Sequence, residues 1–450
     1  MVRLATPVVL AELGWMLQGV VDVIMVGRLG PVAIGAVALG NALYYAPSLF
    51  GLGLLLGLDT VVSQAYGRRD YDACHRWLAQ AVYIALGVTP LLMLPVVMLS
   101  FHIRWFGVDP VLIAPAATYL RVIVWGTLPL LLYTASRRYL QSVGEVRVIM
   151  LTFLGANLAN WGGNWVLING KLGLPAMGVA GSALSTVISR VMMAATLFWF
   201  AWRYEKQRGH PLFEHWAKPI WAEIRELLRL GAPTALQLLM EVGAFAAATV
   251  IAGKISPIAL AAHQIALNYA ATAYMVPLGI SAAAAIAVGH AVGAGDTARA
   301  RRDGWLAMGL AVAFMVVVAI FFLAMPGPLI ALYTHDVSVR RIGAPLLGLA
   351  AAFAVFDAIQ IVATGALRGV GSTRASMVAN LVGYWILGIP LGVWLCFRMQ
   401  WGIYGVWTGL TSALVVISAI LFWYWRKEST AMVAAHRLSN DEAAAKMGHP

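Results

Sequence analysis

Twelve long apolar stretches dominate this chain of 450 residues. A helix needs about 20 mostly apolar residues to cross the hydrocarbon core of a bilayer, and each stretch is about that long. Hydrophobic residues make up 61% of the chain and charged residues only 11%, too few to cover the surface of a water-soluble protein. The sequence therefore predicts an all-α membrane protein with twelve transmembrane helices. These lie near residues 4–26, 36–63, 78–100, 111–136, 148–169, 176–202, 232–253, 258–291, 304–325, 342–366, 375–397 and 402–425.

The basic residues predict which way the helices face. The chain has 31 Lys and Arg against 19 Asp and Glu, a net charge of +12. Loops and tails on one side of the predicted membrane hold 22 of the basic residues, and those on the other side hold 7. Because Lys and Arg concentrate in cytoplasmic loops, we expect both termini in the cytoplasm. Short basic clusters between apolar runs are typical of loops that face anionic lipid, so membrane lipid rather than nucleic acid is the expected partner.

Cysteine usage and the amino terminus exclude two other classes of protein. Cys74 and Cys396 stand far apart and without the spacing of metal ligands, so neither a disulfide framework nor a zinc site is expected. The first apolar stretch, which begins at Leu4, is long enough to span a membrane and lacks an A-x-A cleavage site. It is therefore interpreted as a transmembrane helix and not as a cleavable signal peptide.

An internal repeat divides the chain into two lobes of six helices. A shift of 226 positions places Pro7 on Pro233 and Asp70 on Asp296, with further matches in order along the chain. Six is an even number, so both copies cross the membrane in the same orientation and are expected to be related by a pseudo-two-fold axis along the membrane normal. The expected domains are an amino-terminal lobe, a cytoplasmic linker, a carboxy-terminal lobe and a cytoplasmic tail: 1–202, 203–230, 231–426 and 427–450.

Five acidic residues fall inside the predicted helices: Glu12, Asp22, Asp59, Glu241 and Asp357. A carboxylate at the centre of a bilayer costs about 3 kcal/mol on insertion scales, so such residues are few and usually functional. Glu12 and Asp59 lie nearer the helix ends, where a snorkelling or capping role is expected. The other three acids are the candidates for transport chemistry.

Asp22 is the candidate in the amino-terminal lobe. Asn160 and Asn164 are four residues apart and share a helix face, and Ser185 follows in the next helix. A carboxylate with amide and hydroxyl oxygens suits a sodium ion or a buried proton. The alternative is a polar clamp that holds helices together without an ion.

Glu241 and Asp357 are the candidates in the carboxy-terminal lobe, both near the middle of a predicted helix. Gln237 lies one turn before Glu241, and Phe353 and Gln360 share a side of the helix with Asp357. Two carboxyl groups in a poorly hydrated pocket are unlikely to carry two negative charges at once, which suits a site that exchanges a cation. The alternative is a hydrogen-bonded pair with a structural role.

Several motifs resemble the multidrug and toxic compound extrusion (MATE) transporters, in particular the NorM-like bacterial branch. The first helix resembles theirs from Pro7 through the run Val21–Gly30, and so do Ser63–Gly67, Ala262–Asn268, Asp357–Gln360 and Gly365–Gly369. The resemblance covers about residues 4–425. It implies two six-helix bundles in a bacterial inner membrane that export cationic, amphipathic drugs and dyes while protons or sodium ions move inward.

The resemblance also assigns roles to the candidate residues. It implies that Asp22, Asn160, Asn164 and, more loosely, Ser185 form the cation and proton site of the amino-terminal lobe, and that Glu241 and Asp357 form the site of the other lobe, with sodium possible at either. Gln237, Gln264, Phe353 and Gln360 are the expected residues of the substrate cavity. The family often has a tyrosine where this chain has Phe353, and the missing hydroxyl favours protons over sodium.

The function predicted from the sequence is thus a secondary active antiporter that works as a monomer, with H⁺ or Na⁺ as coupling ion and no other cofactor. A flippase for a lipid-linked oligosaccharide is the alternative, but an anionic pyrophosphate cargo would call for more cations and fewer acids in the membrane. An enzyme is not expected, because no H-E-x-x-H, paired histidine cluster or G-x-S-x-G stands in the predicted helices.

Overall fold

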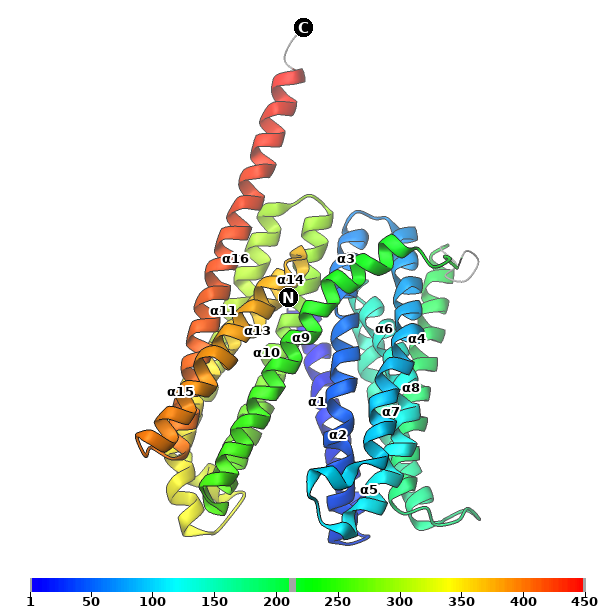
Figure 1. Ribbon diagram of the computed structural model, residues 1–450. Coiled ribbons are helices and arrows are strands. Elements are labelled where there is room, and N and C mark those ends of the chain that lie inside the picture. Colours follow the sequence, from blue (N-terminus) through cyan, green and yellow to red (C-terminus); the bar gives the residue numbers. More distant parts are fainter. Residues whose placement is uncertain (1, 210–215, 448–450) are drawn as a thin grey trace. The chain divides into compact units, whose positions relative to one another are not determined.

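The computed structural model describes residues 2–209 and 216–447, and within these the side chains of residues 2–4, 15–17, 20 and 436–447 are not described. Every regular element of the described residues is a helix (Figure 1). The α-helices are α1 (Val2–Gly27), α2 (Pro31–Leu55), α3 (Gly57–Gly67), α4 (Tyr71–Phe101), α5 (Pro110–Ile123), α6 (Thr127–Ser142), α7 (Val146–Asn169), α8 (Val179–Gln207), α9 (Trp221–Ile255), α10 (Pro257–Gly293), α11 (Thr297–Ala324), α12 (Pro326–Ala331), α13 (Val337–Val370), α14 (Thr373–Asn380), α15 (Ile389–Val393) and α16 (Ile403–Met447). Short 3₁₀ turns η1 (Ile103–Phe106) and η2 (Val124–Gly126) and wide π-helical turns η3 (Leu381–Gly388) and η4 (Trp394–Arg398) interrupt this series.

Ten of the twelve predicted spans are confirmed as helices long and apolar enough to cross a membrane. Some of these spans combine two or more elements, such as α2 with α3 (31–67) and α14 through η4 (373–398). The other two predicted spans, 4–26 and 148–169, coincide with α1 and α7. In α7 the asparagines at 157, 160, 164 and 169 lower the mean hydropathy, and two of them, Asn160 and Asn164, belong to the candidate site discussed below.

The two sequence repeats begin their helices with the same local structures. Asp70 and Asp296, which align at a shift of 226 positions, are the N-caps of α4 and α11, and each carboxylate accepts a hydrogen bond of 2.9 Å from the backbone N–H three residues later. Proline opens α2 and α10 at the equivalent positions Pro31 and Pro257. Such caps satisfy the free N–H groups of the first helical turn, so each repeat carries its own helix-start signals.

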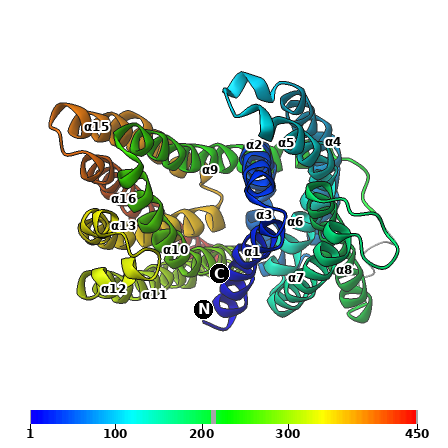
Figure 2. The same ribbon diagram turned by 90° about the horizontal axis from the view of Figure 1, so that it is seen from below.

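The described chain packs as two compact units. The amino-terminal unit comprises residues 6–66 and 70–235, and the carboxy-terminal unit comprises residues 1–5, 67–69 and 236–450. Seen end-on, the long helices of each unit lie side by side as a bundle (Figure 2). The chain passes from one unit to the other within α9, between Ala235 and Leu236. Of the predicted linker 203–230, residues 210–215 lie outside the described residues; the predicted tail continues α16 as far as Met447.

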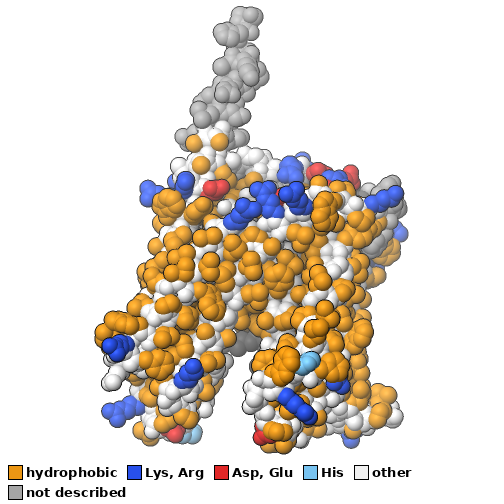
Figure 3. Space-filling view, in the orientation of Figure 1, with side chains coloured by type: hydrophobic (Ala, Val, Ile, Leu, Met, Phe, Trp, Pro, Cys, Tyr) orange, Lys and Arg blue, Asp and Glu red, His pale blue; other side chains and the backbone are white. Residues whose placement is uncertain are grey.

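Hydrophobic side chains cover the middle of the helices on the face drawn in Figure 3, and Lys and Arg lie near the helix ends. Polar residues are instead found inside each unit. The fully or almost fully buried ones include Asp22, Asp59, Glu241, Asp357 and Gln360. Apolar surface around a polar interior is the arrangement that a bilayer requires, because lipid offers no hydrogen-bond partners.

Glycines allow the helices of each unit to approach closely, as in other membrane helix bundles. A side chain at Gly231 in α9 would collide with the backbone of Leu54 in α2. In the other unit, a side chain at Gly365 in α13 would collide with the backbone of Ser281 in α10. The backbones themselves form these helix contacts.

The substitution Gly231→Ala should therefore destabilise the amino-terminal unit. Overpacking a closely packed site costs about 1–3 kcal/mol, and the added methyl group has only backbone atoms against it. We expect a lower midpoint of thermal unfolding for the detergent-purified variant. Gly87→Ala is the matched control, since no atom lies within 4 Å of a Cβ at that position of α4. Equal stability of the two variants would contradict the packing account.

Candidate functional site

Asp22 lies in the middle of a polar cluster inside the amino-terminal unit. Its side chain on α1 is 8% exposed, and Asn164 of α7 donates a hydrogen bond of 2.7 Å from Nδ2 to Oδ1 of the carboxylate. Thr186 of α8 lies 3.3 Å from Oδ2 through its hydroxyl oxygen, but the same hydroxyl is 3.1 Å from the carbonyl oxygen of Ser182. One hydroxyl proton cannot serve both acceptors fully, so Asn164 is the principal donor to Asp22.

Asn160 and Ser185 complete this cluster. Asn164 Nδ2 also donates to Asn160 Oδ1 at 3.2 Å, and Ser185 Oγ donates to the backbone oxygen of Asn160 at 2.9 Å. The structure thus brings together all four residues that the sequence predicts for this lobe. It places the hydroxyl of Thr186, and not that of Ser185, against the carboxylate. The sequence signal for Thr186 is weak, because Ser185 and Thr186 are adjacent and only the rotation of α8 about its axis decides which hydroxyl faces Asp22.

One basic residue lies near this cluster but bonds elsewhere. Arg190, one turn after Thr186 on α8, donates to the hydroxyl of Tyr44 at 2.7 Å and lies over its ring at 5.1 Å. It interacts with Asp22 electrostatically, and no hydrogen bond or ion pair joins the two among the described side chains. Tyr119 donates to Asn41 at 2.9 Å on the same side of the unit. The carboxylate of Asp22 is therefore held by neutral donors alone.

Glu241 lies in the corresponding cluster of the carboxy-terminal unit. Gln360 of α13 donates from Nε2 to Glu241 Oε2 at 3.3 Å and to Asn380 Oδ1 at 3.4 Å. The hydroxyl of Tyr384 donates to Gln360 Oε1 at 3.4 Å, and Tyr274 of α10 bonds to Glu241. All the measured distances exceed the usual 2.9–3.0 Å for N–H···O bonds, so this cluster is more loosely bonded than the one at Asp22.

Asp357 shares α13 with Gln360 and is 4% exposed. Its carboxyl group interacts electrostatically with that of Glu241, and no hydrogen bond to it is found among the described residues. Gln237, one turn before Glu241, is buried. The structure thus places Glu241, Asp357 and Gln360 in one cluster, and it adds Tyr274, Asn380 and Tyr384, which the sequence did not single out. Tyr384 supplies a hydroxyl group to a cluster where Phe353 supplies none.

The remaining cavity candidates have different surroundings. Phe353 packs edge-on against Phe245 and Trp407, with ring centroids 5.9 and 5.7 Å apart. Gln264 is half-buried on α10 beside His263. His263 accepts a hydrogen bond of 3.1 Å at Nδ1 from the indole N–H of Trp407, and its Nε2 lies 3.0 Å from the hydroxyl of Thr249. Because the indole can only donate, the ring proton of His263 is on Nε2, and both nitrogens are used in packing the unit.

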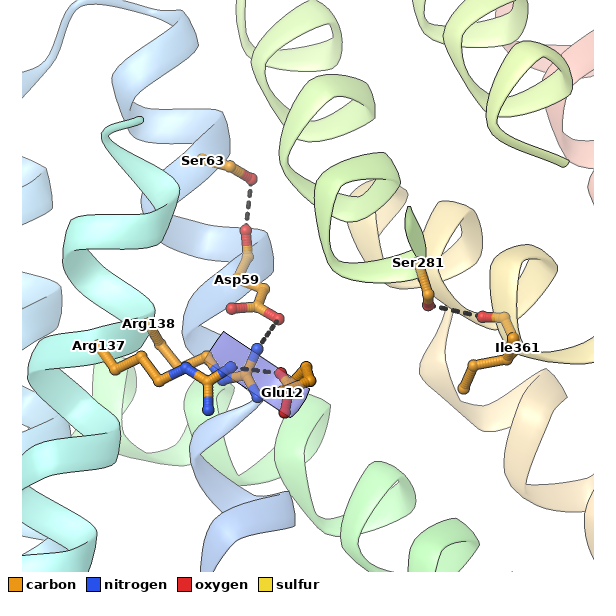
Figure 4. A network of polar contacts seen from close by, with 7 residues as sticks. All are labelled: Glu12, Asp59, Ser63, Arg137, Arg138, Ser281 and Ile361. Carbon is orange, nitrogen blue, oxygen red and sulfur yellow. Dashed lines mark hydrogen bonds and ion pairs between the residues drawn. The ribbon is translucent and has the colours of Figure 1, made fainter. Parts of the chain in front are cut away.

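The two other acids predicted inside the spans, Glu12 and Asp59, are paired with arginines (Figure 4). Arg137 and Arg138 are neighbours on α6. Arg137 Nη2 donates to Glu12 of α1, and Arg138 Nη1 lies 3.5 Å from Asp59 Oδ2 of α3. Asp59 also accepts through its backbone oxygen from Ser63. A charge that is already paired has no need of a further cation, so we interpret Glu12 and Asp59 as structural.

Amide and hydroxyl oxygens lie around Asp22. Within the described residues, no group of three or more His, Cys, Asp or Glu side chains comes together. Around Asp22, however, Asn160 Oδ1, Asn164 Oδ1 and the Thr186 hydroxyl supply oxygen atoms. Hard oxygen ligands of this kind suit sodium as well as a proton on the carboxylate.

Comparisons with known proteins agree with this architecture. The MatE family model matches residues 7–166 and again residues 233–394. The two matches begin 226 residues apart, the shift at which the repeat was found. A probable multidrug resistance protein NorM of Mesorhizobium japonicum is 36% identical over 431 residues, covering 94% of this chain and 92% of the relative. A multidrug resistance protein NorM of Burkholderia vietnamiensis is 33% identical, and the match covers 97% of this chain and 95% of the relative.

Solved structures show the same fold. The outward-facing conformation of a multidrug resistance MATE family transporter of the MOP superfamily superposes with a TM-score of 0.87. Its sequence is 18% identical, and the match covers 96% of each chain. At this identity the similarity establishes the fold: twelve helices in two bundles.

The ion pair between Glu12 and Arg137 should contribute stability and not transport chemistry. Removing one partner of a buried pair leaves an uncompensated charge and costs about 3–5 kcal/mol. Arg137→Met should therefore lower the thermal midpoint of the purified protein strongly. The double variant Glu12→Gln, Arg137→Met leaves no unpaired charge at this pair and should recover most of the loss. A double variant as unstable as the single one would contradict this interpretation.

Proposed function

Since the chain belongs to the MatE family and is a multidrug efflux transporter rather than an enzyme, we propose that it works as a secondary active antiporter. In this proposal, cationic amphipathic compounds leave the cell in exchange for protons or sodium ions that bind at Asp22 and at Glu241 with Asp357. It is a multi-pass protein of the inner membrane, and the excess of basic residues on one side supports a topology with both termini in the cytoplasm.

One observation carries the proposal: the acids predicted inside the spans differ in the charge of their bonded partners. Glu12 and Asp59 each contact an arginine. Asp22 and Glu241 accept hydrogen bonds only from neutral amides and hydroxyls among the described side chains. Arg190 attracts Asp22 electrostatically but bonds to Tyr44 instead. Neutral donors orient a carboxylate but leave its charge in place, and a buried charge without a directly bonded counter-ion is unfavourable. These acids therefore gain most from binding a cation.

Competition for the same negative charge then couples the two fluxes. A proton or sodium ion bound at the acids removes the attraction that holds a cationic substrate, and a bound substrate disfavours the ion in return. The exchange requires no covalent chemistry. The named residues of the two clusters bind and release a cation, and aromatic side chains supply the contacts for a flat organic cation.

The driving force depends on stoichiometry. One charge that moves through about 150 mV releases about 3.5 kcal/mol. A monovalent organic cation exchanged one for one with a proton carries no net charge, so only the chemical gradient of the ion then drives export. If two ions were exchanged for each substrate, one net charge would move inward, and the membrane potential would also drive export. The two acidic clusters of the chain provide sites for two ions.

The acids are tested by neutral substitutions of the same shape. Glu241→Gln, Asp357→Asn and Asp22→Asn should each reduce ethidium efflux from proteoliposomes to the level of liposomes without protein, because the exchangeable charge is lost. The matched controls are Glu226→Gln on α9, which removes an exposed partner of Arg229, and Asp336→Asn, which keeps a side chain able to cap α13. Normal efflux by all three variants, inserted and folded, would show that the acids are structural.

The coupling ion is tested with the wild-type protein by imposing the gradients separately. We expect protons as the coupling ion, because Glu241 and Asp357 lie in one buried cluster and a shared proton relieves the repulsion of their two negative charges. Inside-out vesicles should therefore accumulate ethidium when their lumen is more acidic than the outer solution and the sodium concentration is equal on both sides. Accumulation that follows only a sodium gradient at equal pH would assign the coupling to sodium.

A further inference from the structure

A row of incompletely hydrogen-bonded polar atoms runs along the contact between α1 and α7 in the amino-terminal unit. Gly14, Gln18 and Asp22 are spaced four residues apart and share one face of α1. Asn157 of α7 donates from Nδ2 to the backbone oxygen of Gly14 at 3.2 Å, which brings the two helix faces together. We call the line from Asp22 through Gln18 to Asn157 the α1–α7 seam.

Each amide along the seam has one buried atom without a partner. Gln18 Nε2, Asn157 Oδ1 and Asn164 Oδ1 are buried and make no hydrogen bond to any described residue. Three such atoms in one row are unusual, because buried polar groups are nearly always satisfied by protein or by water, and each unpaired one costs about 1–3 kcal/mol. The seam contains both a free donor and free acceptors, which are the partners that a buried water molecule needs.

The row continues beyond Asn157 toward the ion pair of Glu12 and Arg137. Thr152 Oγ1 on α7 and Arg137 Nε on α6 are buried and unpaired among the described residues. Gln141, one turn after Arg137, has both amide atoms buried and unpaired. Gly14 has no side chain here, and a Cβ at this position would lie 3.5 Å from Phe153 and 3.7 Å from Asn157.

From these atoms we infer that the α1–α7 seam holds a file of buried water molecules that connects Asp22 with the Glu12–Arg137 pair. The ten residues from Glu12 to Asp22 rise about 15 Å along α1, a distance that about five hydrogen-bonded oxygens cover. Such a file can pass a proton by exchange: each water accepts one proton and gives up another, so no group is oxidised and no bond is lost overall. The use of this water file as a proton route between Asp22 and the Glu12–Arg137 pair rests on the proposed function.

Asn157 is the residue that separates a water file from a simple helix clamp. Asn157→Leu keeps the branched shape of the side chain but makes the seam apolar, whereas Asn157→Ala leaves space that water can fill. Both variants lose the hydrogen bond to Gly14. A clamp therefore predicts equal damage from both substitutions, and a water file predicts that only leucine blocks it.

The water is detected by X-ray hydroxyl-radical footprinting with mass spectrometry, which oxidises side chains next to bound water. Phe153 packs beside Gly14 and is 1% exposed, so bulk solvent does not reach it. We expect oxidation of Phe153 in the wild type and in Asn157→Ala, and a rate about tenfold lower in Asn157→Leu. Asn169→Leu is the matched control, because this exposed asparagine bonds only to its own helix and should leave the rate unchanged.

Proton-driven ethidium transport gives the second measurement. Asn157→Leu should lower the maximal rate about tenfold at an unchanged KM for the dye, with Asn157→Ala close to wild type. An unoxidised Phe153 in the wild type, or equal rates for the alanine and leucine variants, would overturn the inference. Neither of these outcomes contradicts the proposed function. The proposed function is contradicted instead if the variants Asp22→Asn, Glu241→Gln and Asp357→Asn still transport ethidium.

Discussion

The cost of a carboxylate inside a bilayer governs the interior of this protein. Each buried acid must be neutralised or hydrogen-bonded, because lipid and apolar side chains can do neither. The chain meets this requirement in two ways. Arginines of α6 neutralise Glu12 and Asp59 permanently, while amides and hydroxyls hold Asp22 and Glu241 and leave the charge available. Permanent pairs stabilise helices, and available charges bind cations. The same physical requirement thus separates structural from transport residues.

The two available acids are held differently, although they occupy related lobes. Asp22 has a short bond of 2.7 Å from Asn164, and several amides around it keep unpaired atoms. Glu241 has a second carboxyl group, Asp357, in its cluster and longer bonds of 3.3–3.4 Å around Gln360. The first cluster offers oxygen ligands and space for water. The second concentrates two acids in one buried place, so its affinity for a first cation is raised by the neighbouring charge.

The sequence predicted the fold closely because its signals are local and repetitive. Apolar length identified the spans, and the shift of 226 residues predicted two related halves. The polar stretch α7 is the instructive case: Asn160 and Asn164 reduce its signal for a membrane span because they belong to the site. Predictions of individual contacts were less complete. Helical spacing put Asn160 and Asn164 on one helix face, and the family resemblance linked them to Asp22. The contact of Thr186 with Asp22 and the position of Tyr384 beside Gln360 depend on how separate helices pack. One sequence does not contain that information.

The central claim is that an inorganic cation and an organic cation compete for the same buried carboxylates. It is tested most directly by measuring proton release when ethidium is added to detergent-purified protein in a weakly buffered solution with a pH indicator, without sodium. The account predicts that dye binding releases protons in the wild type, and that the combination of Asp22→Asn, Glu241→Gln and Asp357→Asn abolishes the release. The claim would be contradicted if the dye binds tightly but releases no protons, and if it also displaces no sodium from protein that was supplied with sodium.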